Sequence, residues 1–483
     1  MGSRLSLWNN GAGNGFLCDS RIIRFLPMLK KRSSLLIIYL LSCVSATAQD
    51  HSTEEAFILA TGRRLPLLYT ISLSEALDPA NNNTANAIVS RNQVALPHLD
   101  GRLLGDPANL VISEDGATAY VINHHGSIDN GEFRQHGGRG QIAVIDVAAA
   151  LNPDNDRSSN ALLRNMDSGG FGAIGTVLLP QLLVINNAEN NLTEDGGNRI
   201  TFVNRRTGGL RHTVELALGN PGFSCDDFPV PYVSPNGPPR ELAVLAPDST
   251  FGCFPNPNGL ALGKTDNENR YLFTANGGTG DVSVVDLEAA LRGDPNAELH
   301  RIGNHPGAWG ITGTPDGRFV IVAHGGRQDI SQAGNTVAIL DVQVAITDPA
   351  SSEVVRIRVG TDDPDTPTHP LILAVTPDGS ELIVPNLRAD NVSIINLEMA
   401  TSGNADAEVA RITLVHPQGG PVRPKGVAIT RDGRYAAISA GPGSLPYSQE
   451  TGLLYLIDLA SREVVGVVSG VGNDPYNLAF VYK

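Results

Sequence analysis

The sequence predicts an all-β fold, a seven-bladed β-propeller built from four-stranded antiparallel blades. Three observations predict it: a unit of about 60 residues recurs along most of the chain, apolar and polar residues alternate with a period of two, and Asp-Gly pairs mark tight turns. The chain of 483 residues also contains 52 Gly and 31 Pro, with only 18% charged residues. This composition disfavours long helices, so strands joined by turns are expected.

Each repeat unit is expected to form a four-stranded meander. The innermost strand follows a Pro and ends in a Ser/Thr-x-Asp-Gly turn, as in residues 106–116, 305–317, 369–379 and 423–433. The second strand is short and apolar, the third alternates and closes on Asp or Asn, and the fourth follows an Asn/Asp/Ala-rich spacer. The closing residues are Asp146, Asn204, Asp286, Asp341, Asn396 and Asp458. The unit near residues 171–216 lacks the Asp-Gly turn.

Six units lie between residues 106 and 462, and the two ends of the chain supply the seventh. Residues 473–483 resemble an innermost strand without a continuation, whereas residues 56–92 contain the other three strands without an innermost one. Joined, they complete one blade and close the ring, which leaves no unpaired strand edge. We therefore predict a single propeller domain over residues 49–483.

The repeats resemble those of YVTN-type propellers, the group that includes surface-layer propellers and a seven-bladed lactonase-like family. The resemblance covers residues 55–483 and rests on the Pro, Ser/Thr-x-Asp-Gly and VSVVDL-like phrases of each unit. It implies the propeller fold, and it implies either ligand binding or lactone hydrolysis. No lactonase catalytic set aligns residue by residue with this chain, so none is assigned. Haem-bearing relatives do not match, because the sequence contains no C-x-x-C-H motif.

Residues 28–48 are expected to form an export signal, with three basic residues, a short apolar run and an Ala-Thr-Ala cleavage site. Residues 1–27 carry no such pattern, so we interpret Met28 as the start of synthesis. The apolar run is far shorter than the roughly 20 residues that span a bilayer, so no transmembrane anchor is expected. A loose lipobox leaves a lipid anchor at Cys43 as an alternative. The predicted location is periplasmic or extracellular.

The charge of the chain excludes nucleic acid as a partner. The formal net charge is −15, and it becomes −20 without residues 1–48, which hold six basic residues and one acidic residue. Such a surface repels phosphate backbones, and the sequence shows no Lys/Arg-rich stripe. The expected partner is a small molecule or a protein.

Cleavage after Ala48 would leave two cysteines, Cys225 and Cys253, in an oxidising compartment. We predict that they form a disulfide, which would close a Pro-rich loop. The alternative is two inert thiols. Neither cysteine belongs to a C-x-x-C pair, so a structural metal site is disfavoured here.

A ligand site is expected on the face where the second-to-third-strand loops and the links between blades emerge. The long loops of this face span residues 123–140, 186–198, 323–335 and 440–452. The residue before each repeat Pro should lie at the channel mouth on this face. These residues are Asp106, Asn256, His305, His369, Arg423 and Asp474. His124, His125 and His324 follow second strands on the same face, and Trp309 is expected to line the channel.

We interpret the chain as an exported binding propeller that takes a ligand or protein partner on this face. One alternative is a lactonase-like hydrolase, in which His305 or His369 is the general base and Arg423 stabilises the oxyanion. Another is an accessory subunit of a periplasmic redox system. Whether the protein is an enzyme stays open, because polar residues at these positions can also simply satisfy backbone groups. No cofactor is predicted, and a divalent metal at the histidines stays an alternative.

The disulfide generates a direct test. In protein isolated from the periplasm, we expect Cys225 and Cys253 to resist alkylation until a reductant is added. Mass spectrometry of the alkylated peptides, with and without reduction, measures this. Complete alkylation without reductant would refute the bridge.

Overall fold

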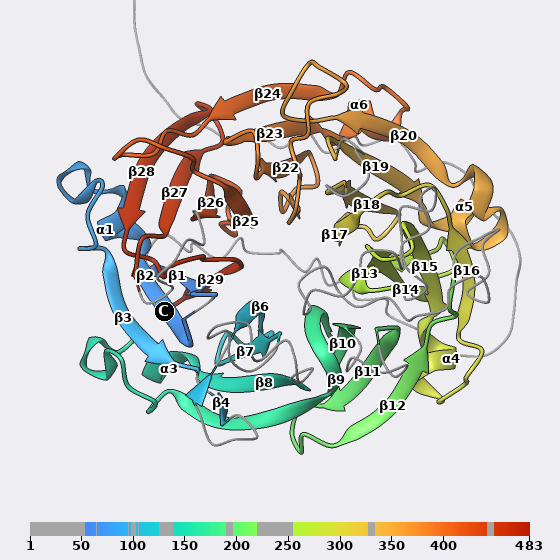
Figure 1. Cartoon of the computed structure of the whole chain (residues 1–483), viewed down its shortest axis with the longest axis horizontal. Helices are drawn as coiled ribbons and strands as arrows, with labels where there is room; N and C mark the ends of the chain where they lie inside the picture. The colour runs from blue at the N-terminus through green and yellow to red at the C-terminus, as the bar shows by residue number, and fades with distance from the viewer. Residues whose placement is uncertain are drawn as a thin grey trace, which may run out of the picture. The chain divides into compact units, whose positions relative to one another are not determined.

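The structure is a computed structural model that describes residues 54–63, 65–94, 96–97, 103–104, 106–124, 139–189, 197–219, 255–326, 334–441 and 449–483. In this part of the chain, seven antiparallel blades surround a central channel, which confirms the predicted fold (Figure 1). The expected export signal, Cys43, His125, Cys225 and Cys253 lie outside the described residues.

Each blade is a four-stranded meander, and its strands are named in order from the channel outwards. The first blade consists of β29 (Leu478–Tyr482), β1 (Ala56–Thr61), β2 (Leu67–Ser72) and β3 (Ile88–Gln93); the second of β6 (Pro107–Ile112), β7 (Thr118–Asn123), β8 (Arg139–Asp146) and the first half of β9 (Leu162–Leu178); and the third of the second half of β9, β10 (Leu182–Glu189), β11 (Arg199–Asn204) and β12 (Leu210–Glu215). A two-stranded hairpin of β4 (Leu96–Pro97) and β5 (Leu103–Leu104) separates the first two blades in sequence.

The remaining four blades follow the same order. They are β13 (Pro257–Lys264), β14 (Arg270–Asn276), β15 (Asp281–Asp286) and β16 (Glu298–Ile302); β17 (Ala308–Gly313), β18 (Phe319–His324), β19 (Thr336–Asp341) and β20 (Glu353–Arg358); β21 (Ala374–Val375), β22 (Glu381–Asn386), β23 (Asn391–Asn396) and β24 (Glu408–Thr413); and β25 (Pro424–Ile429), β26 (Tyr435–Ala440), β27 (Leu453–Asp458) and β28 (Glu463–Ser469).

The two ends of the described chain close the ring, as the sequence predicts. Strand β29 pairs antiparallel with β1, with Phe57 opposite Val481 (Figure 1). Backbone hydrogen bonds between Glu55 and Lys483, of 3.1 and 2.9 Å, extend this pairing. The last strand therefore becomes the innermost strand of the first blade.

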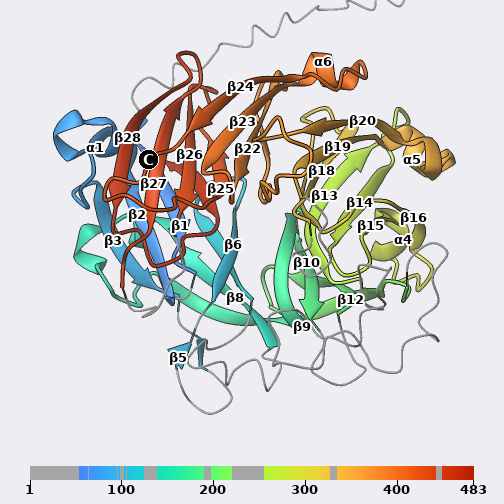
Figure 2. The same cartoon turned by 45° about the horizontal axis from the view of Figure 1, so that its top comes forward.

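The second and third blades are joined differently from the others. Strand β9 pairs with β8 along its first half and with β10 along its second half, so it is the outer strand of one blade and the inner strand of the next (Figure 2). This continuity explains the irregular repeat near residues 171–216. Its Asp-Gly turn is replaced by a turn over Pro180 and Gln181, in which the Leu179 amide donates to the Leu182 carbonyl at 2.9 Å.

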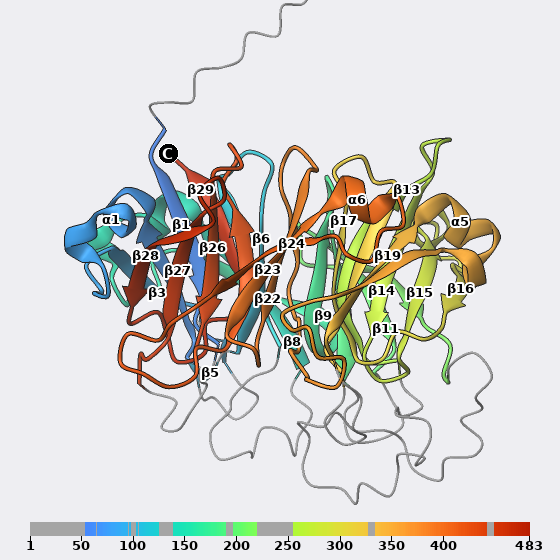
Figure 3. The ribbon, with the colours of Figure 1, turned by 90° about the horizontal axis from the view of Figure 1, so that it is seen from above.

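The spacers after the third strands contain one-turn helices, which the sequence pattern did not predict. They are α1 (Leu73–Leu77), α3 (Val147–Ala150), α4 (Leu287–Leu291), α5 (Val342–Thr347) and α6 (Leu397–Thr401), with 3-10 turns η1 (Pro79–Asn81), η3 (Pro153–Asn155) and η7 (Pro349–Ser351). Figure 3 shows α1, α5 and α6 towards one side of the disk and β5 at the other. No helix in the described residues is long and apolar enough to cross a membrane.

In the units that close on Asp146, Asp286, Asp341 and Asn396, the closing Asp or Asn is a helix N-cap, whereas Asn204 and Asp458 close turns without a helix. Asp286 accepts a hydrogen bond from the Ala289 amide at 2.8 Å, and Asp341 accepts one from Val344 at 3.0 Å. Ser72 occupies the same position in the first blade. Each cap satisfies a backbone amide that a short helix would otherwise leave without a partner.

The hydrophobic core lies between neighbouring blades. In one such layer, Ile339 of β19 packs with Leu382 of β22, and both side chains are fully buried. The largest fully buried side chains are Tyr69, Tyr455, Phe202 and Phe273. Because the apolar faces meet between blades, the beginnings of the inner strands are left to carry polar side chains around the channel.

The cap role predicts a measurable stability effect. Asp341→Ala removes the cap of α5 and should lower the free energy of unfolding by about 1 kcal/mol, as chemical denaturation can measure. Asp348→Ala is the matched control, because Asp348 precedes η7 without a side-chain cap hydrogen bond. An equal loss in both variants would contradict the cap assignment.

Candidate functional site

The residues before the repeat prolines fix the inner strands to the preceding blades. The His369 amide donates to the Gly334 carbonyl at 2.6 Å, and the Asn256 amide donates to Gly197 at 2.8 Å. The Arg423 amide donates to Asp390 Oδ1 at 2.8 Å. All three residues have φ between 53° and 55°, a region that non-Gly residues seldom adopt. This position therefore has a structural role, and its unusual backbone directs the side chains around the channel mouth.

Two predicted site residues, Asp106 and Asp474, belong to one buried ionic cluster. Asp106 Oδ1 lies 3.3 Å from Arg63 Nε, and Asp474 forms an ion pair with Lys425. Lys425 Nζ also donates to the Gly441 carbonyl. The cluster brings together the links before β6 and β29, the link after β1, and strand β25.

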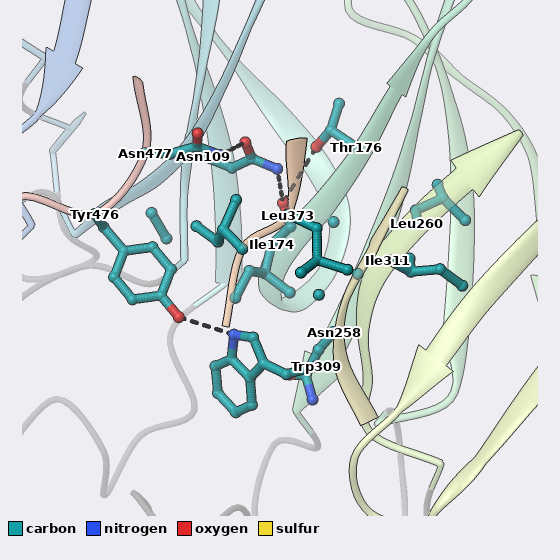
Figure 4. A pocket seen from close by; sticks show the side chains of 15 residues that line it. Asn109, Ile174, Thr176, Asn258, Leu260, Trp309, Ile311, Leu373, Tyr476 and Asn477 are labelled. Carbon is teal, nitrogen blue, oxygen red and sulfur yellow. Dashed lines mark hydrogen bonds between the residues drawn. The ribbon is translucent and has the colours of Figure 1, made fainter. Parts of the chain in front are cut away.

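Tyr476 connects this cluster to the channel. The Arg63 guanidinium lies 4.6 Å from the centre of the Tyr476 ring, a cation–π contact, and Trp309 Nε1 donates to the Tyr476 hydroxyl at 2.9 Å (Figure 4). Both aromatic residues line a cavity of about 160 Å³ in the channel. The amides of Asn109 and Asn258 line the same cavity. An aromatic wall beside amide groups is an arrangement that can hold a polar ring.

Burial and charge set the protonation of the cluster. Burial lowers the pKa of Lys425, although Asp474 opposes this effect. Burial raises the pKa of Tyr476 to about 12, against the opposing effect of Arg63. For Arg63 burial acts to lower the pKa, but Asp106, Tyr476 and Asp474 together raise it. The site therefore holds cations and carboxylates in fixed pairs, away from water.

The sequence interpretation missed Arg63, Lys425 and Tyr476. Lys425 and Tyr476 each come directly after a repeat Pro, two positions beyond the residue that was predicted to lie at the channel mouth. Applying the same repeat register to that later position would have found both. Arg63 follows a second strand and becomes recognisable only once the ring is closed.

The predicted histidines form a second, neutral group. His305 Nδ1 lies 2.9 Å from His324 Nε2, and His324 Nδ1 lies 2.8 Å from the Thr336 hydroxyl. His369 Nδ1 donates to the Gly325 carbonyl. Burial lowers the pKa of His305 to about 3 and that of His369 to about 4, and it lowers the pKa of His324 well below its usual value. Within the described residues, no three His, Cys, Asp or Glu side chains are arranged to hold a metal ion.

The other predicted residues lie near these two groups. His124 is buried, with Nδ1 3.1 Å from the Ala173 carbonyl, and its amide donates to the Asp106 carbonyl. Arg423 is exposed and is one of the charges that lower the pKa of Lys425. The roles assigned to His305, His369 and Arg423 in catalysis stay predictions.

Comparison with known proteins shows solved structures that share this fold at low sequence identity. No family profile matches the chain, and no curated protein matches its sequence. A periplasmic gluconolactonase from Pseudomonas aeruginosa has a TM-score of 0.55 at 14% identity, covering 89% of this chain and 99% of that chain. Candidate 6-phosphogluconolactonases from Bacteroides fragilis and Bacteroides uniformis both have a TM-score of 0.52, at 16% and 14% identity, with the same coverage. The chain therefore shares the fold of lactonase-like propellers.

The buried histidine pair predicts a loss of stability in acid. The folded protein keeps both rings neutral, whereas the unfolded chain protonates them near pH 6.5, so this contribution is complete above that pH. As the pH falls towards the folded pKa of His305, about 3, stability should fall by about 1.4 kcal/mol per pH unit for each histidine. Denaturant unfolding between pH 7 and pH 4.5 measures this slope.

Asparagine variants test this assignment. Asn123 and Asn276 occupy the position of His324 in other blades, opposite the start of the inner strand. We expect His305→Asn/His324→Asn to flatten the pH dependence, whereas His416→Asn, in a partly exposed link between blades, should leave it unchanged. An unaltered slope in the double variant would contradict the buried neutral pair.

Proposed function

We propose that the protein is an exported propeller that binds a small sugar-acid-like ligand, polyhydroxylated and carrying a carboxylate or its lactone, at the channel mouth. The observation that carries the proposal is the buried ionic cluster of Arg63, Asp106, Lys425 and Asp474, joined through Tyr476 to a cavity. A periplasmic or extracellular location is part of the proposal.

The chemistry of the cluster supports this class of ligand. Ligand hydroxyls can bond to the carboxylates and to the amides of Asn109 and Asn258, while the aromatic rings of Trp309 and Tyr476 can contact a sugar ring. Arg63 and Lys425 can donate hydrogen bonds to the ligand carboxylate. The charges are already paired before binding, so they cost little reorganisation when a polar ligand replaces water.

The volume of the channel cavity limits how much of the ligand can enter it. A volume of about 160 Å³ is smaller than the roughly 300 to 1,000 Å³ typical of ligand pockets, so only part of a sugar acid enters the channel. We expect the remaining part to lie at the mouth, where the exposed Arg423 provides a further cation.

A second candidate function is hydrolysis of the lactone form. It is favoured by a buried carboxylate, Asp474, held against a buried amine, Lys425. Asp474 would take a proton from the water that attacks the lactone carbonyl, and Lys425 and Arg63 would stabilise the oxyanion. Asp474 would then return the proton to the ring oxygen as the C–O bond breaks, which yields the hydroxy acid. The lactonase names of the similar propellers from Pseudomonas aeruginosa and Bacteroides fragilis agree with this candidate.

Calorimetry with gluconate and a hydrolysis assay with glucono-1,5-lactone test both candidates. Lys425→Met/Asp474→Asn removes both charges together, so it does not leave one charge buried alone. We expect the double variant to weaken gluconate binding roughly tenfold or more while circular dichroism shows a folded propeller.

Lys264→Met is the matched control, since Lys264 lies at the other end of an inner strand and pairs with Glu268 on the surface. Unchanged gluconate affinity in the Lys425→Met/Asp474→Asn variant would overturn the channel-mouth proposal. Lactone turnover by the unmodified protein that is lost in the double variant would establish the hydrolase.

A further inference from the structure

A second cavity lies on the face opposite the channel mouth. It has a volume of about 590 Å³ and lies between the second and third blades, lined by residues of β7, β8, β9, β11 and β12. The turn at Pro180 and Gln181 and the turn after Asn204 form part of its wall. Its size falls within the range of small-molecule sites, unlike that of the channel cavity.

Four arginines line this cavity: Arg164, Arg205, Arg206 and Arg211. Arg205 is held in place by neutral groups, with Nε 3.2 Å from the Tyr120 hydroxyl and the guanidinium bonded to the carbonyls of Leu179 and Pro180. Arg164 donates to the Arg205 carbonyl at 2.6 Å. In the described part of the chain, the guanidinium groups of Arg206 and Arg211 form no hydrogen bond or ion pair.

No acidic side chain lines this cavity within the described residues, although the protein carries 50 acidic and 35 basic residues. Asp115 interacts with Arg205 electrostatically from outside the lining, and its carboxylate accepts hydrogen bonds from the Ser113 hydroxyl at 2.6 Å and from the Ala117 amide. The positive charge of the cavity is therefore uncompensated by its own wall. An anion bound in the cavity would therefore meet cations that have no carboxylate partner in the wall.

One side of the same cavity is apolar. Leu163 is 59% exposed and lines the cavity together with Tyr120, Val144 and Pro180. Leu210, between Arg206 and Arg211 in sequence, is 52% exposed. Large exposed leucines next to arginines form a surface that suits an anion with an apolar or ring-shaped part.

We propose that this cavity, which we call the arginine cavity, binds a phosphate monoester whose organic part contacts Leu163 and Tyr120. A phosphate dianion matches the uncompensated charge better than a single carboxylate, and guanidinium groups can bind its oxygens in pairs. The proposal concerns binding and involves no chemical step. It is independent of the channel-mouth function, which lies on the other face.

Calorimetry with phenyl phosphate in a buffer free of phosphate tests the proposal. We expect one molecule to bind per chain, more tightly than inorganic phosphate, and phenol to give no signal. Arg206→Gln/Arg211→Gln should weaken binding roughly tenfold or more, because charge-assisted hydrogen bonds are lost. The substitutions should not unfold the protein, since both side chains are exposed and form no bond within the described residues.

Arg318→Gln is the matched control, since Arg318 is exposed in an Asp-Gly turn of the same face in another blade. Unchanged binding in the Arg206→Gln/Arg211→Gln variant, or an equal loss in Arg318→Gln, would overturn the proposal. Phenyl phosphate binding that persists in Lys425→Met/Asp474→Asn would support a site separate from the channel mouth, and its loss there would overturn this assignment.

Sedimentation with vesicles identifies the source of the phosphate group. If a lipid headgroup is bound, the protein should sediment with vesicles that contain phosphatidic acid, whose headgroup is a phosphate monoester, and not with phosphatidylcholine vesicles. The double arginine variant should stay in solution. If a free ester is bound, phenyl phosphate binds and neither vesicle retains the protein. Both results support the arginine cavity, whereas vesicle binding that the double variant retains would overturn a lipid-headgroup role.

Discussion

The pairing of β29 with β1 is the interaction on which the rest of the molecule depends. It closes the ring and removes the unpaired edges that an open array of blades would expose. It also assembles the channel-mouth site, because Arg63 follows β1 while Asp474 and Tyr476 precede β29. Residues more than 400 positions apart in sequence thus meet at one point. Loss of this pairing would separate Arg63, which follows β1, from Tyr476 and Asp474, which precede β29.

The ionic cluster and the histidine group at the channel mouth offset the free-energy cost of burying polar side chains in different ways. The ionic cluster keeps its charges, because Arg63 and Lys425 each have a carboxylate within ion-pair distance. The histidine group removes the charge instead, since burial holds His305 and His324 neutral and a ring-to-ring hydrogen bond satisfies one nitrogen of each. The first arrangement can recognise a polar ligand electrostatically. The second is rigid and neutral, and it supports the start of β17.

The fold could be predicted from the sequence because the sequence patterns that specify it are local and recur in each repeat. Asp-Gly turns, closing Asp residues and alternation each act over a few residues, so they are visible without tertiary contacts. The one-turn helices escaped prediction because five residues are too few to show a helical period. The candidate site was only partly predictable. Asp106, Asp474 and Trp309 were found from their place in the repeat, and Lys425 could have been found two positions after Arg423 in the same register. Arg63 is recognisable only from the contacts that closure creates.

The two cavities also differ in how charge would select a ligand. At the channel mouth every cation of the buried cluster faces a carboxylate, so selection there depends on the directions of hydrogen bonds and on the fit of a ring against Trp309 and Tyr476. In the arginine cavity the cations have no such partners among the described residues of the wall. Selection of a ligand there would depend on the electrostatic attraction between the net positive charge of the wall and an anion. The acidic surface of the chain repels anions generally, which confines that attraction to short range. If both proposals hold, a strongly charged anion would bind where the arginines gather, and a polar ring would bind in the channel.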